Sequence, residues 1–443
     1  MFKTIRNALS IPDIRKKLLF TLLVVVIYRI GSVIPVPFVD LAALQTAMGG
    51  IDGNSMFAYL NTMTGGAFSN ATIFAMGITP YINSSIIMQL LCVAIPALER
   101  LSKEGEDGRK KIATITRYVT VGLGLLQGFA FFMYLKGSNL LEYSEGFAVW
   151  FAGAVIVLSF TAGTALMMWL GEQINDRGIG NGISILLFAG IVARLPLTVV
   201  KIIDYFKIAS SGLLSGFAAY KYYIFVPIFI LLFLVVIWVI TFMQDAERRL
   251  PVQYAKRVVG RKMYGGQSSH LPIKVALGGV MPVIFASSIL SIPSTIQMFV
   301  KPEEGTFFYK VFAALNPGSS SPWLYLVLYF LLILAFAYFY TAIQYNPVEM
   351  ANNLKQNNGT IPGFRPGTPT ADFIRKVLSR ITLIGAFFLA FIAIVPTIYT
   401  TLTGLSALSM GGTSVIIVVG VALETVKQLE SQMMMRHYKG FLD

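Results

Sequence analysis

Charged residues, cysteine and histidine are all scarce in this chain. Only 13% of its 443 residues are charged, whereas soluble proteins usually carry about 25%. A chain of this length therefore cannot build a shell that faces water on all sides. The single cysteine, Cys92, excludes an intramolecular disulfide. The two histidines, His270 and His437, lie far apart and argue against a zinc site, so we expect no metal and no cofactor.

Signatures of catalysis and of ion coupling are also missing. The sequence has no HExxH motif, no Walker loop and no GxSxG motif in a suitable setting. Ionisable residues in the apolar runs are few: Arg29 lies near the end of the first run, Glu172 and Asp176 at the edge of the fourth, and Glu424 near the end of the last. Membrane enzymes and ion-coupled transporters usually carry such residues inside their spans. We therefore expect a protein that is not an enzyme.

Apolar residues, which make up 56% of the chain, fall in long runs separated by short polar stretches. A helix of about 20 apolar residues spans a bilayer because its backbone groups hydrogen-bond internally. The alternation typical of an outer-membrane barrel is absent. We predict a single all-α polytopic membrane domain, residues 1–443, with ten transmembrane helices. The predicted spans are residues 18–36, 74–95, 114–136, 147–171, 183–203, 222–243, 275–299, 322–344, 378–399 and 407–427.

The 35 Lys and Arg residues are distributed unevenly between the two ends of these spans. If the N-terminus is cytoplasmic, 27 of them fall on the cytoplasmic side and 7 on the opposite side, with Arg29 inside the first span. Basic residues favour the cytoplasmic side, so we predict that both termini are cytoplasmic. The basic segment that ends at Lys17, followed by an apolar run, resembles a signal peptide. No convincing cleavage site follows, so we interpret the run as an uncleaved first span.

Two predicted cytoplasmic loops, residues 245–274 and 345–375, are longer than simple connectors. The first is strongly basic, and the second is polar and rich in Gly and Pro around a lone Arg365. Positive charge alone is compatible with setting topology and touching anionic lipid. A polar tip around one arginine binds lipid poorly, however, and favours a docking surface for a cytoplasmic partner.

The segment 55–74 on the opposite side is too polar, and at Gly65 and Gly66 too broken, to span the membrane. It is also too apolar for an exposed loop. One interpretation is an amphipathic piece that lies in the outer interface. The other is a short helix folded back into a cavity between the spans, where surrounding protein or water tolerates it.

Uncharged polar side chains recur in the middle of three predicted spans. Their ordinary role in membranes is to hold helices together by hydrogen bonds. The alternative is that they line a seam between helices that opens. These residues are Asn83, Ser84, Ser85 and Gln89 in the second span, Gln127 in the third, and Ser287, Ser288 and Ser291 in the seventh.

Nine stretches of the chain have a highly specific amino-acid sequence. They are RIGSVIPVP (29–37), GGAFSNATIFAMGITPYINSSIIMQLL (65–91), KEGEDGRKKI (103–112), GEQINDRGIGNGISILLFAGIVARLP (171–196), QYAKRVVGRKMYGGQSSHLPIKV (253–275), GVMPVIFASSIL (279–290), YTAIQYNPVEMANNLK (340–355), IPGFRPGTPT (361–370) and GGTSVIIVV (411–419). In this order and spacing they resemble the bacterial SecY family, the channel-forming subunits of the Sec protein translocase. The resemblance covers nearly the whole chain.

The resemblance implies two inverted five-helix halves around a central pore. The N-terminal half is then residues 18–203 (spans 1–5), followed by span 6 with its cytoplasmic loop (204–274) and by spans 7–10 (275–443). The implied protein is a protein-conducting channel of the general secretory (Sec) pathway in the bacterial cytoplasmic (inner) membrane. It passes unfolded polypeptides across the membrane and releases apolar segments laterally into lipid.

The resemblance also implies four sets of site residues. The pore ring is Ile82, Ile86, Ile183, Leu187, Ile284 and Ile417, with Leu187 at a position where the family often has isoleucine. The plug, residues 56–71, includes Phe57, Leu60, Gly65, Gly66 and Phe68. The lateral gate includes Asn83, Ser85, Gln89, Gln127, Ser287 and Ser288. The docking residues are Lys256, Arg257, Arg261, Lys262 and Arg365.

The partners implied by the resemblance are SecE-like and SecG-like membrane subunits, the SecA motor ATPase, the ribosome, unfolded preproteins with signal sequences, and membrane lipid. Two other functions stay open. One is an inverted-repeat secondary transporter, which typically carries ion ligands near the membrane midplane. The other is an insertase scaffold that never conducts.

Overall fold

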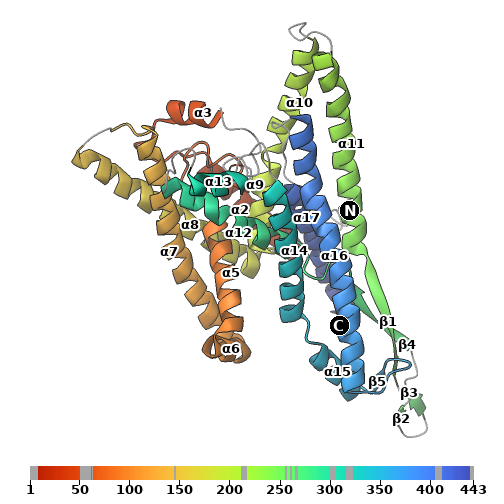
Figure 1. Cartoon of the computed structure of the whole chain (residues 1–443). Coiled ribbons are helices and arrows are strands. Elements are labelled where there is room, and N and C mark those ends of the chain that lie inside the picture. Colours follow the sequence, from red (N-terminus) through yellow and green to blue (C-terminus); the bar gives the residue numbers. More distant parts are fainter. Residues whose placement is uncertain are drawn as a thin grey trace.

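The computed structural model describes residues 8–49, 61, 63–143, 146–210, 217–254, 257–259, 262–264, 268–299, 306–315, 323–404 and 412–439. Helices dominate this part of the chain, and short strands lie near one end of the molecule (Figure 1). The helices are α2 (Pro12–Gly31), α3 (Leu41–Gly49), α5 (Thr79–Ala94), α6 (Pro96–Lys103), α7 (Glu106–Gly137), α8 (Phe147–Arg177), α9 (Gly182–Val192), α10 (Leu195–Ser210), α11 (Phe217–Asp245), α12 (Met281–Phe299), α13 (Phe307–Ala314), α14 (Trp323–Gln344), α15 (Pro347–Gln356), α16 (Thr368–Thr403) and α17 (Gly412–Lys439). The strands are β1 (Glu247–Tyr254), β2 (Arg257–Val259), β3 (Lys262–Tyr264), β4 (Ser268–Lys274) and β5 (Gly359–Thr360).

Within the described residues, 7 helical segments are long and apolar enough to cross a membrane. They are α7, α8, α9 with α10, α11, α14 with α15, α16 and α17. The pair α5 and α6, bent by 102°, adds one more. Two shorter helices complete the ten predicted spans: α2 carries charges at both ends, and α12 contains Pro293. The protein is therefore a mainly helical, multi-pass membrane protein.

The spans sort into two groups that are joined by the hairpin of α10 and α11 (Figure 1). In the first group α5 packs on α7, α7 on α8, and α8 on α2 and α9; in the second, α12 packs on α14, α14 on α16, and α16 on α11 and α17. The groups meet where α12 packs against α5 and α7 and where α17 packs against α9. The largest buried cluster contains side chains from both groups, such as Leu187 and Ile284.

A tight loop between α8 and α9 sets the position of α9. The Asn181 side chain caps α9 by accepting a hydrogen bond from the N–H of Ile183 at 3.1 Å. A Cβ atom on Gly182 would lie only 1.9 Å from the carbonyl oxygen of Gly171. Because glycine permits this approach, α9 begins directly against α8. Ile183 and Leu187, one turn apart on α9, are thereby held in the central cluster.

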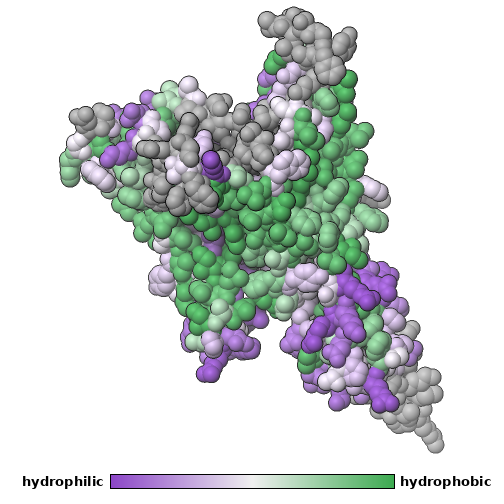
Figure 2. All heavy atoms as spheres, viewed as in Figure 1, coloured by the Kyte–Doolittle hydropathy of each residue, from purple (hydrophilic) through white to green (hydrophobic). Residues whose placement is uncertain are grey.

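On the face shown in Figure 2, apolar side chains form a broad band, and polar side chains gather at the end that carries α6, α15 and the strands. Large apolar side chains of the spans are often exposed, for example Leu231 and Trp238 of α11. In a helix that crosses a bilayer, such side chains contact lipid rather than water. The band therefore matches the membrane-embedded part of the spans.

The two long loops join into one structure, which the sequence did not predict. Strands β4, β1 and β5 form an antiparallel sheet in that order, in which β5 from the second loop pairs with β1 from the first. Val252 of β1, Ile273 of β4, Ile361 after β5 and Ile374 of α16 are buried in one cluster. We call this unit (β1, β4, β5, α15 and the first turns of α16) the loop platform.

Several predicted spans differ from the helices in their bounds. The first predicted span ends at 36, but α2 ends at Gly31, because the chain then turns to form a bridge between Pro35 and Thr72. The seventh was expected to begin at 275, yet α12 begins at Met281, after Gly279 adopts a φ of +56°. Glycine adopts this conformation without strain. Because the conformation does not fit a regular helix, α12 begins only after Gly279.

Candidate functional site

A small apolar cavity lies where helices of the two groups converge. Four of the predicted ring residues line it: Ile82 of α5, Leu187 of α9, Ile284 of α12 and Ile417 of α17. Its volume is about 20 Å³, room for about one water molecule. We call this site the constriction; it is closed in the structure.

The other two ring residues lie beside the cavity without lining it. Ile86 is one turn beyond Ile82 on α5, Ile183 is one turn before Leu187 on α9, and both belong to the same apolar cluster. The six residues predicted from the family pattern are thus brought together, four around the cavity and two in the adjoining layer.

Four further residues line the constriction: Met63, Thr79, Ser288 and Ser291. Ser288 and Ser291 belong to the mid-span polar set of the seventh span. Sequence reasoning missed Thr79, and Met63 fell within the predicted plug without being singled out. Their apolar or weakly polar character gives no signal by itself, because the chain path that brings Met63 back to the centre is a tertiary feature.

The described part of the predicted plug consists mainly of turns. Gly65 and Gly66 have φ angles of +66° and +93°, which glycine adopts without strain. Phe68 is buried, with its ring centroid 4.7 Å from that of Phe131 on α7. The described part of the segment is therefore packed into the protein.

The mid-span serines of α12 form hydrogen bonds within their own helix. Ser287 donates to the carbonyl of Ile284 at 2.9 Å, and Ser291 to that of Ser288 at 2.6 Å. On the facing helix α5, the Gln89 amide donates to the Ser85 hydroxyl at 3.2 Å. Each of these bonds joins two groups of one helix and survives if α12 and α5 separate.

The remaining predicted gate residues, Asn83 of α5 and Gln127 of α7, are half-buried. They lie on the two helices against which α12 packs. The helices of the predicted gate are therefore in contact.

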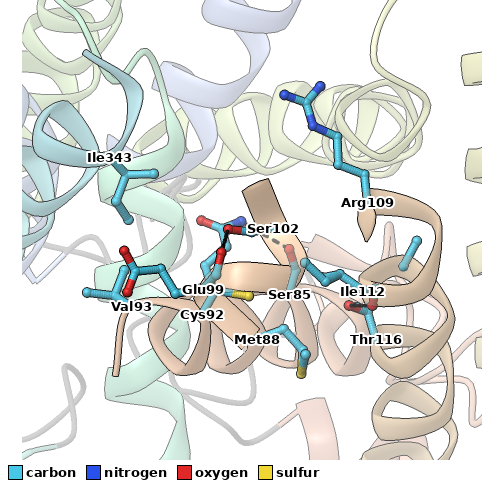
Figure 3. Close-up of a pocket in the computed structure, with 12 residues that line it drawn as sticks. Ser85, Met88, Cys92, Val93, Glu99, Ser102, Arg109, Ile112, Thr116 and Ile343 are labelled. Atoms are coloured by element: carbon cyan, nitrogen blue, oxygen red, sulfur yellow. Dashed lines mark hydrogen bonds between the residues drawn. The ribbon is translucent and has the colours of Figure 1, made fainter. Parts of the chain in front are cut away.

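A larger cavity of about 500 Å³ lies between α5, α6, α7 and the end of α14 (Figure 3). We call it the crevice. Met88, Val93 and Ile112 give it apolar walls, Ile343 comes from α14, and Arg109 lies at its polar edge. Its volume falls in the range of ligand-binding cavities, which is about 300–1,000 Å³.

The crevice also contains two predicted gate residues, Ser85 and Gln89, and the only cysteine, Cys92. Glu99 on its rim accepts a hydrogen bond from Lys103 at 2.6 Å, which lowers the pKa of this carboxyl. Glu99 is therefore ionised at neutral pH. The crevice joins an apolar interior to a charged edge.

Arg365 is exposed on a firmly held loop of the platform. Its carbonyl accepts a hydrogen bond from the Thr370 hydroxyl at 2.8 Å. The rings of Phe364 and Phe373 stack with centroids 4.2 Å apart, and Gly367 caps α16 with a φ of +105°. The backbone around Arg365 is thus fixed to α16, and the side chain faces solvent.

Four predicted site residues, Phe57, Leu60, Lys256 and Arg261, lie outside the described residues. Arg257 and Lys262 belong to β2 and β3, which pair antiparallel.

The charges at the edges of the spans are partly paired. Arg117 of α7 and Glu172 of α8 form an ion pair at 2.8 Å, and Lys427 of α17 meets Asp245 of α11 at 2.5 Å. Across the described ranges, no three His, Cys, Asp or Glu side chains come together as a metal site requires.

Known proteins resemble this chain both in sequence and in fold. The SecY family profile matches residues 72–426. The protein translocase subunit SecY of Streptomyces galbus is 45% identical over 450 aligned residues, which cover 100% of both chains. A solved structure described as a protein conducting channel matches with a TM-score of 0.66 at 17% identity, over 95% of this chain and 92% of that chain.

Sec61 in the canine ribosome-channel complex from the endoplasmic reticulum has the same fold. The match has a TM-score of 0.63 at 16% identity and covers 95% of this chain and 92% of that chain. The full-length sequence match and the family profile agree with the nine sequence stretches and with the two groups of helices around a closed apolar constriction. This chain belongs to the SecY family.

Proposed function

We propose that this protein is the polypeptide-conducting channel of a Sec translocase. The observation that carries the proposal is the constriction, where side chains from four helices of both groups enclose about 20 Å³ of apolar space. A narrow apolar collar resists wetting and so resists ions. Flexible aliphatic side chains can also close around an extended polypeptide without binding any particular sequence.

The plug and the gate complete this mechanism. Met63, next to the plug turns, lines the constriction, so movement of the plug opens the path. The hydrogen bonds from Ser287 to Ile284 and from Ser291 to Ser288 lie within α12, so these two bonds do not have to break when α12 separates from α5. An apolar signal sequence then leaves through this seam because lipid solvates it better than water does.

The loop platform supports docking of a cytoplasmic partner. Arg365 is presented on a rigid loop, and the basic first loop is joined to it through the sheet of β4, β1 and β5. We infer that SecA or a ribosome binds here and drives transport, so that this chain performs no covalent chemistry. The match to Sec61 from a ribosome-channel complex supports the ribosome as one such partner.

We further infer SecE-like and SecG-like subunits against the lipid-facing spans, as expected for a translocase subunit. The distribution of basic residues supports a cytoplasmic position for the platform and for both termini. The membrane is then the bacterial cytoplasmic membrane. Residues 18–203 and 275–443 would move as the two halves, with α10 and α11 as the hinge.

The direct test is reconstitution of the chain with SecE-like and SecG-like subunits in liposomes. Adding SecA, ATP and a preprotein is expected to yield preprotein that protease cannot reach. A preprotein without its signal sequence is the matched control and stays accessible. Failure of both preproteins to enter, in vesicles that contain the folded complex and bind SecA, would favour a non-conducting scaffold instead.

A further inference from the structure

The base of the plug, residues 63–66, is bound to the C-terminal end of α2. Side chains of α2 donate hydrogen bonds to backbone carbonyls of the plug base. The Tyr28 hydroxyl, which is buried, donates to the carbonyl oxygen of Thr64 at 3.2 Å. The neighbouring Arg29 guanidinium donates to the carbonyl of Gly65 at 3.5 Å, the outer limit of such a bond. These contacts join the first span to a segment 36 residues further along the chain.

The same region packs closely on α9 at Gly190. A Cβ atom on Gly190 would lie 2.6 Å from the carbonyl oxygen of Met63 and 2.8 Å from the Tyr28 hydroxyl. A Cβ atom on Gly65 would in turn lie 2.8 Å from the carbonyl oxygen of Gly190. Since real Cβ atoms do not approach other atoms within 3.0 Å, two glycines permit the contact between the plug base and α9.

The plug base is internally rigid. The N–H of Gly66 donates to the carbonyl of Asn61 at 2.9 Å, and the N–H of Phe68 donates to the Thr64 hydroxyl at 3.2 Å. The N–H of Ser69 donates to the Asn61 side chain at 3.1 Å. A displacement at Thr64 is therefore transmitted to Met63, which lines the constriction.

We propose that Tyr28 and Gly190 form a latch that holds the plug base in its closed position. Tyr28 is a positioning residue: it does not line the constriction and acts through Thr64. Opening requires the buried bond between Tyr28 and Thr64 to break, so the latch sets how strongly a signal sequence must bind before the channel opens. This inference rests on the proposed function, in which residues 56–71 are the plug.

The first test is Tyr28→Phe, which keeps the ring and removes the hydroxyl. Loss of one buried hydrogen bond is expected to raise the open fraction about fivefold. The reconstituted complex without preprotein should leak ions more by that factor. It should also export a preprotein with a defective signal sequence more efficiently, while export of the normal preprotein stays near the wild-type rate.

Tyr329→Phe is the matched control. Tyr329 is a buried tyrosine of α14, and its hydroxyl lies 2.8 Å from that of Thr413 on α17. We expect a similar loss of thermal stability in both variants but a leak only in Tyr28→Phe. Equal leakage and equal export of the defective preprotein in the two variants would overturn the latch.

A second variant, Gly190→Ala, tests the steric half of the latch. Its added methyl group must push the plug base or the Tyr28 hydroxyl away, so the leak is expected to rise again. Gly122→Ala on α7 is the control, because a Cβ atom there meets nothing within 4 Å. A Gly190→Ala channel as tight as Gly122→Ala would contradict the inference.

Deletion of residues 58–70 separates failure of the latch from failure of the plug. If the deletion leaks while Tyr28→Phe and Gly190→Ala match their controls, the latch fails and the plug assignment stands. If the folded deletion variant is as tight as the wild type, the plug assignment fails and the latch with it.

Discussion

At the scale of single residues, the seal depends on how completely side chains fill the constriction. Ile82, Leu187, Ile284 and Ile417 leave a cavity of about 20 Å³, which has room for about one water. A chain of waters, which ion conduction requires, has no room to form. Shortening one of these side chains therefore affects conduction as well as stability.

Ile284→Ala is predicted to make the resting channel leak ions. It removes side-chain atoms from the wall of the constriction and costs about 2–5 kcal/mol of stability. The measurement is ion conductance of the reconstituted complex in the absence of preprotein.

Leu290→Ala is its control, because Leu290 is also buried on α12 but does not line the constriction. We expect a similar stability loss with no leak. If both variants are tight, Ile284 is an ordinary packing residue.

Arg365→Glu is predicted to slow export that is driven by SecA, because it reverses the charge at the exposed tip of the platform. The fold should be unaffected, since the loop is held by the Thr370 hydroxyl and the stacked rings of Phe364 and Phe373. ATP-driven import into vesicles gives the rate.

Lys207→Glu makes the same charge change on an exposed residue of α10 and should export at the wild-type rate. If Arg365→Glu exports at the wild-type rate, Arg365 does not belong to the docking surface.

At the scale of elements, α16 connects the loop platform to the core of the second group of helices. Ile374 and Leu378, near its beginning, are buried with strands from both loops, and Leu389 and Ala393, further along, belong to the central cluster. A force applied to the platform by a docked partner is therefore carried into the membrane along one continuous helix. The sheet makes the two loops respond together.

Ile374→Ala is predicted to loosen both loops at once. The change removes a fully buried side chain shared by β1, β4, α15 and α16 and costs about 2–5 kcal/mol locally. Hydrogen exchange should accelerate in residues 247–254 and 347–356 together.

Phe391→Ala, on the lipid-facing side of the same helix and 67% exposed, should leave exchange in the platform unchanged. Acceleration confined to one loop would mean that the sheet does not couple them.

Much of this architecture could be predicted from the sequence, and the reasons for the misses are specific. The spans follow from apolar runs, which need no tertiary information. The strands were missed because their residues are largely polar and their pairing joins residues as distant as Gln253 and Thr360. The approach of Gly190 to Met63 was missed because a glycine carries no signal about what it touches.

At the scale of the whole molecule, two groups of helices meet along α5, α7 and α12, and the crevice lies beside this seam. Its apolar wall and charged edge match an apolar helix that follows a polar segment, as in a signal sequence. Cys92, the only cysteine of the chain, lines it. The native protein thus carries its own labelling site.

Labelling of Cys92 by a water-soluble maleimide is predicted to slow when a signal peptide is bound, because the peptide fills the crevice. The rate is followed by mass spectrometry on the reconstituted complex. A Cys92→Ser variant fixes the background, and a peptide with charged residues in its apolar core should give no protection. Equal labelling rates with both peptides would show that the signal sequence does not bind in the crevice.

A polypeptide that crosses the membrane through this protein must pass the constriction. A photoreactive amino acid at position 284 detects that passage when a preprotein is halted partway by a folded domain at its C-terminus. We expect an ATP-dependent cross-link from position 284 to the halted chain. The same group at the exposed, lipid-facing position 238 of α11 should give none. Cross-links from position 238 but not from 284 would mean that the polypeptide does not pass through the constriction.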